Sequence, residues 1–532
     1  MKKFLFILLL CICCFSIAAC KSEVKDEINQ EKIDEVIEAI DLLPTKAKLS
    51  DEAAINYASD LYNALSEKEK ALVSNISTLN EALKRLDYYR NEEEAILKVV
   101  KNAKAYLETS IPNYVDYKTT SITLPNYYEG ETEYEKYTIN FTWISSNNNV
   151  INTNGEVKHD SIDTKVTLTA KLNTRKLANI EDFSVEVNVG RISFKDLSKG
   201  HIISGYLYSR YPGFNALDVK TLDIVNICFA SIIEQDGNFS VSTAGVNFMD
   251  KVTELRNHGI RVVLSIGGWK DNSEEWQPYK NAAASEASRK QVANAILKIL
   301  QEHHLDGVDM DWEYPTSSDK TNFTLFMKEI RDTLKAYNKD YLVTAAIPAG
   351  TWINYNYNLK ELNNVLDYFN IMSYDLDDGS KTSHMCALNN STYAATSASA
   401  SVDYLTKNGV SKSKIIIGAA FYGRIFYDVK STNNGLGQSY SSKNSISFTD
   451  ISSNYLNKSN VKRYYDSTAH AYYLYDSTNQ VFISYDDPDA IKDKCNYVIE
   501  NDLAGIMYWS YTDDMTNTLM HALYDKLEDM KK

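Results

Sequence analysis

Three acidic side chains alternate with apolar ones in the segment LDGVDMDWEYP, at residues 305–315. Asp309, Asp311 and Glu313 would share one face of a β-strand, because successive side chains of a strand point to opposite faces. Such a row is costly to bury unless the carboxylates share protons or contact a ligand. A solvated acidic turn or a metal site is disfavoured by the interleaved apolar residues and by the lack of adjacent His or Asn ligands. The spacing therefore indicates a catalytic site.

The surrounding chain predicts a barrel that would position this strand. From about residue 201, apolar runs alternate with helical patterns, and a (β/α)8 TIM barrel of eight strands fits that length. Barrel enzymes keep their chemistry at the carboxyl ends of the strands, where Glu313 would lie. The gap before the last strand is too long for one helix and predicts a Tyr-rich insertion at roughly 427–485. The candidate strands begin near Ile203, Ile224, Arg261, Asp306, Tyr341, Tyr368, Lys414 and Ala504.

Two smaller regions precede the barrel. Residues 21–105 are expected to form a helical module, because Ile33, Val36 and Ile40 recur with helical spacing. At 106–190 the apolar period changes to two, and Asn154 with Gly155 marks a hairpin turn, which predicts a β-sandwich. The run INFTWISSNNNVINTNGEV resembles bacterial immunoglobulin-like domains. Both regions are interpreted as spacers, with adhesion or carbohydrate binding as the alternative.

Composition excludes some partners and leaves others open. The 532 residues include 71 acidic and 56 basic side chains, a formal charge of −15 that opposes nucleic-acid binding. The 38 tyrosines suit either sugar surfaces or Tyr-rich strands. Neither the three cysteines beyond residue 20 nor the eight histidines have metal-ligand spacing, so no metal or cofactor is expected. A monomer is expected.

The first twenty residues are expected to be a signal peptide, 1–20. Lys2 and Lys3 precede an apolar run at 4–19 that is short for a membrane span of about 20 residues. The sequence IAAC, which ends at Cys20, resembles the lipobox of bacterial lipoproteins. That resemblance implies cleavage before Cys20, lipid attachment to its thiol and display on the extracellular face of a bacterial membrane. A secretory signal that releases the chain is the alternative.

The acidic strand also carries a family resemblance. Asp306, Asp309, Asp311 and Glu313 match the DxxDxDxE signature of the family 18 glycoside hydrolases, the chitinase family. SIGG at 265–268, MSYD at 372–375, FYGR at 421–424 and GIMYWSYTDD from Gly505 are similar to further motifs of that family, in order, over about 201–526. The resemblance implies a small α+β insertion between strands seven and eight.

The resemblance also implies roles for individual residues in a substrate-assisted mechanism. Glu313 would be the general acid, and Asp311 would hold the acetamido N–H of the sugar. Asp309 would share a proton with Asp311. Tyr374 would bind the acetamido oxygen, and Trp509 would lie beneath the sugar. Further sugar contacts are expected from Tyr206, Trp269, Met372, Asp375, Tyr422 and Arg424. Supporting roles are expected for Ser265, Gly267, Gly268 and Asp306.

The expected activity is retaining hydrolysis of β-1,4-linked N-acetylglucosamine polymers, chitin or chito-oligosaccharides. An endo-β-N-acetylglucosaminidase acting on N-glycan cores, a peptidoglycan-directed enzyme and a surface carbohydrate-binding protein with little turnover are the alternatives. The intact Glu313 argues against lectin-like members that have lost this residue. Asp377 and Asp378 stand where many chitinases continue with aromatic residues, and GAAFYGR lacks a proline common before the tyrosine. These departures leave chain-end preference and substrate length open.

Overall fold

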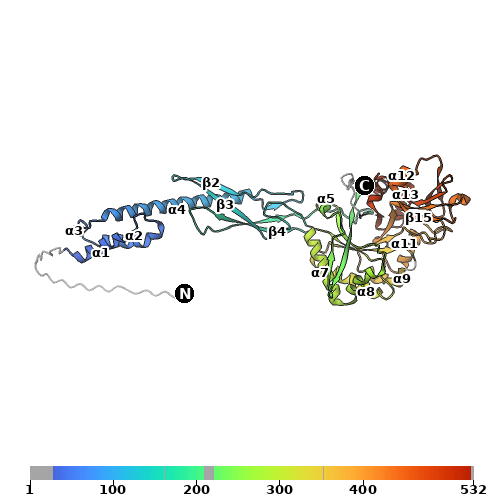
Figure 1. Cartoon of the computed structure of the whole chain (residues 1–532), viewed down its shortest axis with the longest axis horizontal. Coiled ribbons are helices and arrows are strands. Elements are labelled where there is room, and N and C mark those ends of the chain that lie inside the picture. The colour runs from blue at the N-terminus through green and yellow to red at the C-terminus, as the bar shows by residue number, and fades with distance from the viewer. Residues whose placement is uncertain (1–27, 161, 209–220, 351–352, 529–532) are drawn as a thin grey trace, which may run out of the picture. The chain divides into compact units, whose positions relative to one another are not determined.

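The computed structural model of the chain describes residues 28–160, 162–208, 221–350 and 353–528 (Figure 1). The predicted signal peptide and Cys20 lie outside the described residues. The chain divides into two compact units: 1–108 with 125–142 and 171–182, and the remainder. In the described part of the chain, no helix is both long and apolar enough to cross a membrane.

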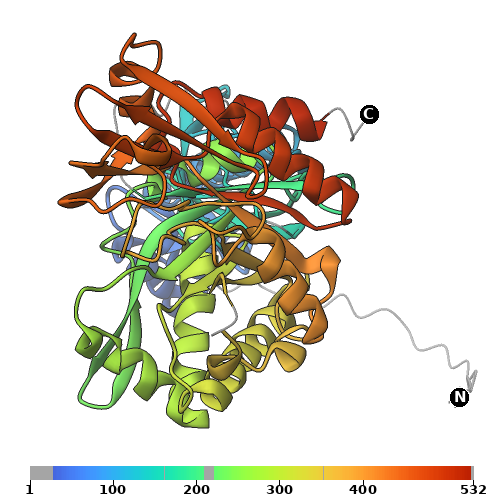
Figure 2. The same cartoon turned by 90° about the vertical axis from the view of Figure 1, so that its right-hand side faces the viewer.

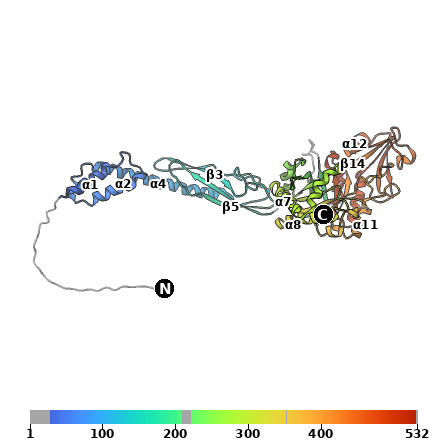
Figure 3. The ribbon, with the colours of Figure 1, turned by 60° about the horizontal axis from the view of Figure 1, so that its bottom comes forward.

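The first unit contains the helices that the apolar spacing predicted. Ile33, Val36 and Ile40 are buried along one face of the first helix and pack with Ile55 and Leu86 in a common core. Ser66 and Glu69 form a capping box, in which each side chain bonds the backbone N–H of the other residue. The first two helices lie beside the start of the long fourth helix (Figures 1 and 3). The helices are α1 (Gln30–Asp41), α2 (Glu52–Asn63), α3 (Glu67–Lys70) and α4 (Ile76–Ser110).

A five-stranded sheet accounts for the β-rich region before the barrel. Its order is β1-β5-β4-β3-β2, with β1 parallel to β5 and the pairs β4–β5 and β2–β3 antiparallel. Ile139, Phe141 and Trp143 are buried at alternate positions of β3, as their period of two predicted. The strands are β1 (Tyr114–Val115), β2 (Tyr127–Glu131), β3 (Lys136–Ser145), β4 (Thr164–Asn173) and β5 (Phe183–Val189).

Eight parallel strands form the closed barrel that the sequence predicted. The order β6-β19-β13-β12-β11-β10-β9-β7 closes because β6 also pairs with β7, while β8 (Asn238–Ser242) extends β7 as a hairpin. The barrel strands are β6 (Ile202–Leu207), β7 (Ile224–Gln235), β9 (Arg261–Gly267), β10 (Gly307–Asp311), β11 (Leu342–Pro348), β12 (Tyr368–Met372), β13 (Ile415–Ala420) and β19 (Gly505–Trp509).

Helices cover the outside of the barrel (Figure 2). Two of them begin at clear sequence signals: Ser285 caps α7, and Asp487 caps α13 immediately before Pro488. The helices are α5 (Val252–Asn257), α6 (Gln277–Ala284), α7 (Glu286–His303), α8 (Lys320–Tyr337), α9 (Ile353–Asn356), α10 (Leu359–Leu362), α11 (Ala398–Lys407), α13 (Pro488–Glu500) and α14 (Thr518–Glu528).

The acidic strand β10 is buried along its whole length. Val308 and Met310 belong to the core cluster that the helices share, so they point outward. Asp309 and Asp311 alternate with them and point into the barrel. Asp309 stands in register with Ser265 on β9 and with Thr344 on β11. The barrel thus places carboxylates where most barrels place apolar layers.

The insertion between the seventh and eighth barrel strands is a second, antiparallel sheet with the order β15-β14-β18-β17-β16. It begins at Tyr422, directly after β13, and its own core includes Phe426, Tyr473 and Phe482. The Tyr-rich run RYYDSTAHAYYLYD forms the β16–β17 hairpin. Its elements are β14 (Tyr422–Tyr427), β15 (Ser442–Ser447), α12 (Phe448–Asn454), β16 (Val461–Asp466), β17 (Ala471–Asp476) and β18 (Val481–Tyr485).

Candidate active site

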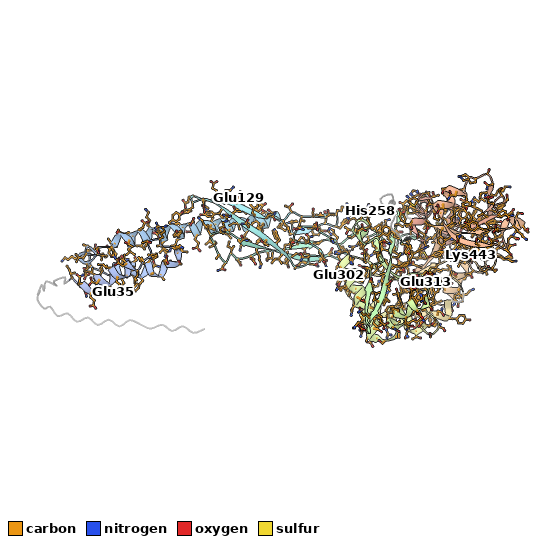
Figure 4. All side chains as sticks on the ribbon, viewed as in Figure 1. Glu35, Glu129, His258, Glu302, Glu313 and Lys443 are labelled. Atoms are coloured by element: carbon orange, nitrogen blue, oxygen red, sulfur yellow. The ribbon has the colours of Figure 1, made fainter. Side chains whose placement is uncertain are left out.

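A cleft of about 880 Å³ opens at the carboxyl ends of the barrel strands. Figure 4 labels Glu313 in the barrel and Lys443 in the insertion. The wall contains most of the residues singled out from the sequence. They are Tyr206, Trp269, Asp311, Glu313, Met372, Tyr374, Asp375, Tyr422, Arg424 and Trp509. The cleft therefore collects side chains from strands far apart in the sequence.

Asp309 lies fully buried beneath the cleft and accepts four hydrogen bonds. Its Oδ2 accepts from the hydroxyls of Tyr206 and Ser265, both at 2.9 Å. Its Oδ1 accepts from the hydroxyl of Thr344 at 2.6 Å and the amide of Asn370 at 3.1 Å. Burial raises the pKa of Asp309, although these donors favour its charged form. Asp309 is therefore held rigidly in one orientation.

Asp311 is the next carboxylate toward the cleft. It is buried, and its Oδ1 has no hydrogen-bond partner among the described residues. Burial raises the pKa of Asp311 well above its usual range, and the charges of Glu313 and Asp309 raise it further. Because the three carboxyls cannot all ionise at low cost, Asp311 is suited to hold a proton that it passes to or from its neighbours. Its orphaned oxygen is free to bind a substrate N–H.

Glu313 follows the end of β10 and faces the cleft. Burial raises the pKa of Glu313 to about 7, and the charge of Asp375 acts in the same direction. A hydrogen bond with the side chain of Tyr314 partly opposes this rise. A carboxyl with a pKa near neutrality is suited to donate a proton and then take one back. Tyr314 was not predicted, because its contact with Glu313 depends on the turn after the strand.

The SIGG turn lies directly against the acidic strand. Gly267 has a φ of +129°, and a Cβ at this position would lie 2.0 Å from the carbonyl oxygen of Asp311. The N–H of Gly268 donates to that same oxygen at 2.9 Å. Glycine is required at residue 267 both by its backbone conformation and by the close approach of the acidic strand.

Aromatic side chains form the base of the cleft. The ring of Trp509 stacks on Phe229 with centroids 5.6 Å apart and also contacts Tyr206 and Tyr208. Trp269 has an exposed fraction of 68%, which leaves its ring accessible to a ligand. Flat apolar faces of this kind suit the apolar faces of sugar rings. Tyr208 and Phe229 were not predicted as site residues, although they lie in SGYLYS and VNICFAS, the runs of the first two barrel strands.

Residues that follow strands six and seven of the barrel form a further part of the cleft wall. The ring of Tyr374 packs edge-on against Tyr422. Among the described residues, the hydroxyl of Tyr374 has only a weak sulfur acceptor, Met507 Sδ at 3.8 Å. Arg424 Nη2 donates to Asp375 Oδ1 at 2.8 Å, which fixes the carboxylate that faces Glu313. The Tyr374 hydroxyl is therefore free to donate to a substrate oxygen near Glu313.

Asp306 lies apart from this cleft despite its place in the acidic signature. It precedes β10, and its carboxylate accepts from the N–H of Val262 at 2.9 Å and pairs with the buried Arg256. Asp306 therefore secures the beginning of β10, while Asp309, Asp311 and Glu313 serve its other end. The acidic signature therefore contains one carboxylate that holds the strand in place, Asp306, and three carboxylates at or beneath the cleft.

Two of the donors to Asp309 were also not predicted. Thr344 and Asn370 are polar residues within the otherwise apolar runs YLVTAAIP and YFNIM. A polar side chain that points into a barrel requires a partner there. The presence of a polar residue within each apolar run was therefore a signal in the sequence. The sequence alone did not show that both side chains would donate to Asp309.

A closed parallel barrel with paired buried carboxylates at its carboxyl end defines a glycosidase-type site. The family model "Glycosyl hydrolases family 18" matches residues 202–514, and "Atrophied bacterial Ig domain" matches 100–189. The chain therefore belongs to family 18 of the glycosyl hydrolases.

Several characterised proteins are similar to the barrel. Chitinase A1 of Niallia circulans is 31% identical over 313 residues, which are 52% of this chain and 44% of that protein. Endochitinase 1 of Metarhizium anisopliae is 30% identical over 310 residues, 54% of this chain and 71% of that protein. Among solved structures, a family 18 N-acetylglucosaminidase from Paenibacillus barengoltzii has 33% identity and a TM-score of 0.56, covering 62% of this chain and 100% of that one.

Proposed function

We propose that this protein is a retaining glycoside hydrolase that cleaves the β-1,4 linkages of chitin or chito-oligosaccharides. The observation that carries the proposal is the row of Asp309, Asp311 and Glu313, in which the pKa of Glu313 is raised to about 7. The similarity to Chitinase A1 and Endochitinase 1 supports the substrate class. The same row supports a mechanism in which the substrate supplies the nucleophile.

The first step uses the protonated Glu313. Its carboxyl donates a proton to the glycosidic oxygen as the bond to C1 breaks, and the leaving sugar departs with that proton. The acetamido oxygen of the same sugar attacks C1 and forms an oxazolinium ion. Asp311 accepts the acetamido N–H and stabilises the positive charge, while the Tyr374 hydroxyl donates to the acetamido oxygen and orients it for attack.

The second step reverses the roles. The ionised Glu313 takes a proton from water as the water oxygen attacks C1, and the oxazolinium ring opens to restore the acetamide. Two inversions at C1 retain the configuration of the anomeric carbon. Asp309, held by its four donors, limits the charge that Asp311 must carry at each stage.

A substrate panel tests the activity and separates it from its alternatives. Chitotetraose, an N-glycosylated protein and peptidoglycan are each incubated with the native protein and with Glu313→Gln. We expect cleavage of chitotetraose, with a loss of about 10²–10⁴-fold in kcat in the variant because no proton donor remains. Cleavage only of the glycoprotein would support the endo-β-N-acetylglucosaminidase alternative. Binding without cleavage would support a carbohydrate-binding protein.

Cys20 supports a proposal about location. The basic start, the apolar run and IAAC at 17–20 support cleavage before Cys20 and attachment of lipid to its thiol. The mature protein would then be a monomer anchored on the outer side of a bacterial membrane. About 180 residues between Cys20 and the barrel would serve as a spacer.

A further inference from the structure

The carboxylates of the cleft differ in how their charge is balanced. Asp375 is paired with Arg424, and Asp377 is paired with Lys443 from the insertion. Burial raises the pKa values of Asp311 and Glu313, and neighbouring carboxylates raise them further. The full set that lines the cleft is Asp271, Asp311, Glu313, Asp375 and Asp377.

Apart from Asp311 and Glu313, Asp271 is the one carboxylate of this set with no cationic partner among the residues that the structure describes. It is exposed, and it follows β9 at the mouth of the cleft. The ammonium group of the neighbouring Lys270 lies over the ring of Trp276 instead, 5.5 Å from the centroid. Asp271 therefore presents to whatever enters the cleft a negative charge that no described residue neutralises.

This carboxylate lies at the edge of an aromatic platform. The indole Nε1–H of Trp269 donates to Asp271 Oδ1 at 3.2 Å, while the indole ring has an exposed fraction of 68%. A sugar that stacks on the indole would bring a ring substituent within reach of the carboxylate. The exposed indole of Trp269 and the carboxylate of Asp271 together form one binding position, and the negative charge of Asp271 makes this position favour a cationic ligand.

The chemistry of that substituent distinguishes two sugars. An N-acetylated sugar offers one neutral N–H, whereas a free 2-amino group is protonated at mildly acidic pH, where it carries a positive charge and three donors. Hydrogen bonds between opposite charges are about twice as strong as neutral ones. Asp271 should therefore favour glucosamine over N-acetylglucosamine at the Trp269 position.

We propose that Trp269 and Asp271 form a binding position for a glucosamine unit, so that the preferred substrates are partly deacetylated chains. The proposal rests on the proposed hydrolase function. N-acetylglucosamine remains necessary at the cleaved linkage, because the acetamido oxygen is the nucleophile. The formal charge of −15 acts in the same direction, since it attracts a cationic polymer and repels an anionic one.

Asp271→Asn tests this position with little change in shape. The asparagine oxygen retains the ability to accept from the indole N–H, while the charge is removed. Glu275→Gln is the matched control, because it removes one exposed negative charge nearby from a residue that does not line the cleft. Fully acetylated chitohexaose and half-deacetylated chito-oligosaccharides are the substrates, and mass spectrometry gives the sugar order of the products.

For the native protein, we expect glucosamine to be enriched at one fixed position relative to the cut. Asp271→Asn should lose this enrichment and about threefold to fivefold of kcat/KM on the deacetylated mixture, the size of an exposed charge pair. Its loss of kcat/KM on chitohexaose should be smaller than its loss on the deacetylated mixture, because a neutral acetamido group forms no charge pair with Asp271. Added salt should reduce the difference between the two proteins, because it screens exposed charges. Glu275→Gln should behave as the native protein.

Identical sugar orders from native protein and Asp271→Asn would overturn the proposal, as would an equal loss on both substrates. Native protein that cleaves chitohexaose but shows no glucosamine enrichment would overturn this inference alone. Native protein that cleaves neither substrate would instead contradict the proposed hydrolase function. The two proposals therefore fail in different ways.

Discussion

At the scale of single residues, the three carboxylates of the site differ in their burial, their hydrogen-bond partners and the charges beside them. Asp309 accepts four hydrogen bonds, Asp311 has an oxygen with no partner in the described structure, and Glu313 faces the cleft. The pKa values of all three are raised. Environment, rather than residue type, therefore separates their roles.

The raised pKa of Glu313 predicts the alkaline limb of the pH profile. Glu313 must be protonated to donate to the glycosidic oxygen, so kcat should fall as the pH rises above about 7. Initial rates on chitotetraose between pH 4 and pH 10 measure this limb. An activity that continued to rise to pH 10 would show that Glu313 does not donate the proton.

The same pKa predicts a stability effect of Glu313→Gln. A carboxyl whose pKa is higher in the folded protein than in the unfolded chain destabilises the fold as it ionises, between its ordinary 4.5 and about 7. The glutamine side chain of the variant cannot ionise, so the variant does not lose stability in this way as the pH rises. At pH 8 its free energy of unfolding should exceed that of the native protein by up to about 3 kcal/mol. Thermal melts should show equal stability at pH 4, and a variant less stable at pH 8 would contradict the burial argument.

At the scale of elements, the barrel strands were located accurately from sequence, and the contacts between strands were not. Each predicted strand start lies within one residue of the observed one, because strands buried on both faces appear as apolar runs. Thr344 contacts Asp309 because it is the register partner of Asp309 on β11, and Asn370 reaches Asp309 from β12, one strand further along the barrel. Spacing along one strand cannot specify partners on another.

The contact between the SIGG turn and β10 predicts an effect of Gly267→Ala. The added methyl group would collide with the carbonyl of Asp311, so the variant should lose about 2 kcal/mol or more of stability and most of its activity. Gly237→Ala is the control, because Gly237 also has a positive φ but a methyl group added there would have no other atom within 4 Å. Equal losses in denaturant melts would mean that backbone strain alone explains the glycine.

At the scale of the whole molecule, every described residue that lines the cleft comes from the barrel or its insertion, between Tyr206 and Trp509. The preceding helices and sheet contribute no lining residue among those described. The interpretation of these two regions as spacers stays a prediction. The predicted signal peptide is separated from the catalytic residues along the chain.

That separation predicts the outcome of Cys20→Ala. The variant should move from the membrane fraction to the medium or soluble fraction when expressed in a bacterial host, because the lipid has no attachment site. Its kcat/KM on chitotetraose should match that of the native protein. A variant that stayed in the membrane fraction after a high-salt wash would refute lipid attachment at Cys20.

The central claim is that the substrate's acetamido oxygen attacks C1 and that Glu313 then activates water on the same face. The most direct measurement is the anomeric configuration of the first product, followed by proton NMR within the first minutes of chitotetraose cleavage, before mutarotation. We predict that the β-anomer appears first and later equilibrates with the α-anomer. Initial appearance of the α-anomer would show inversion and would contradict the mechanism.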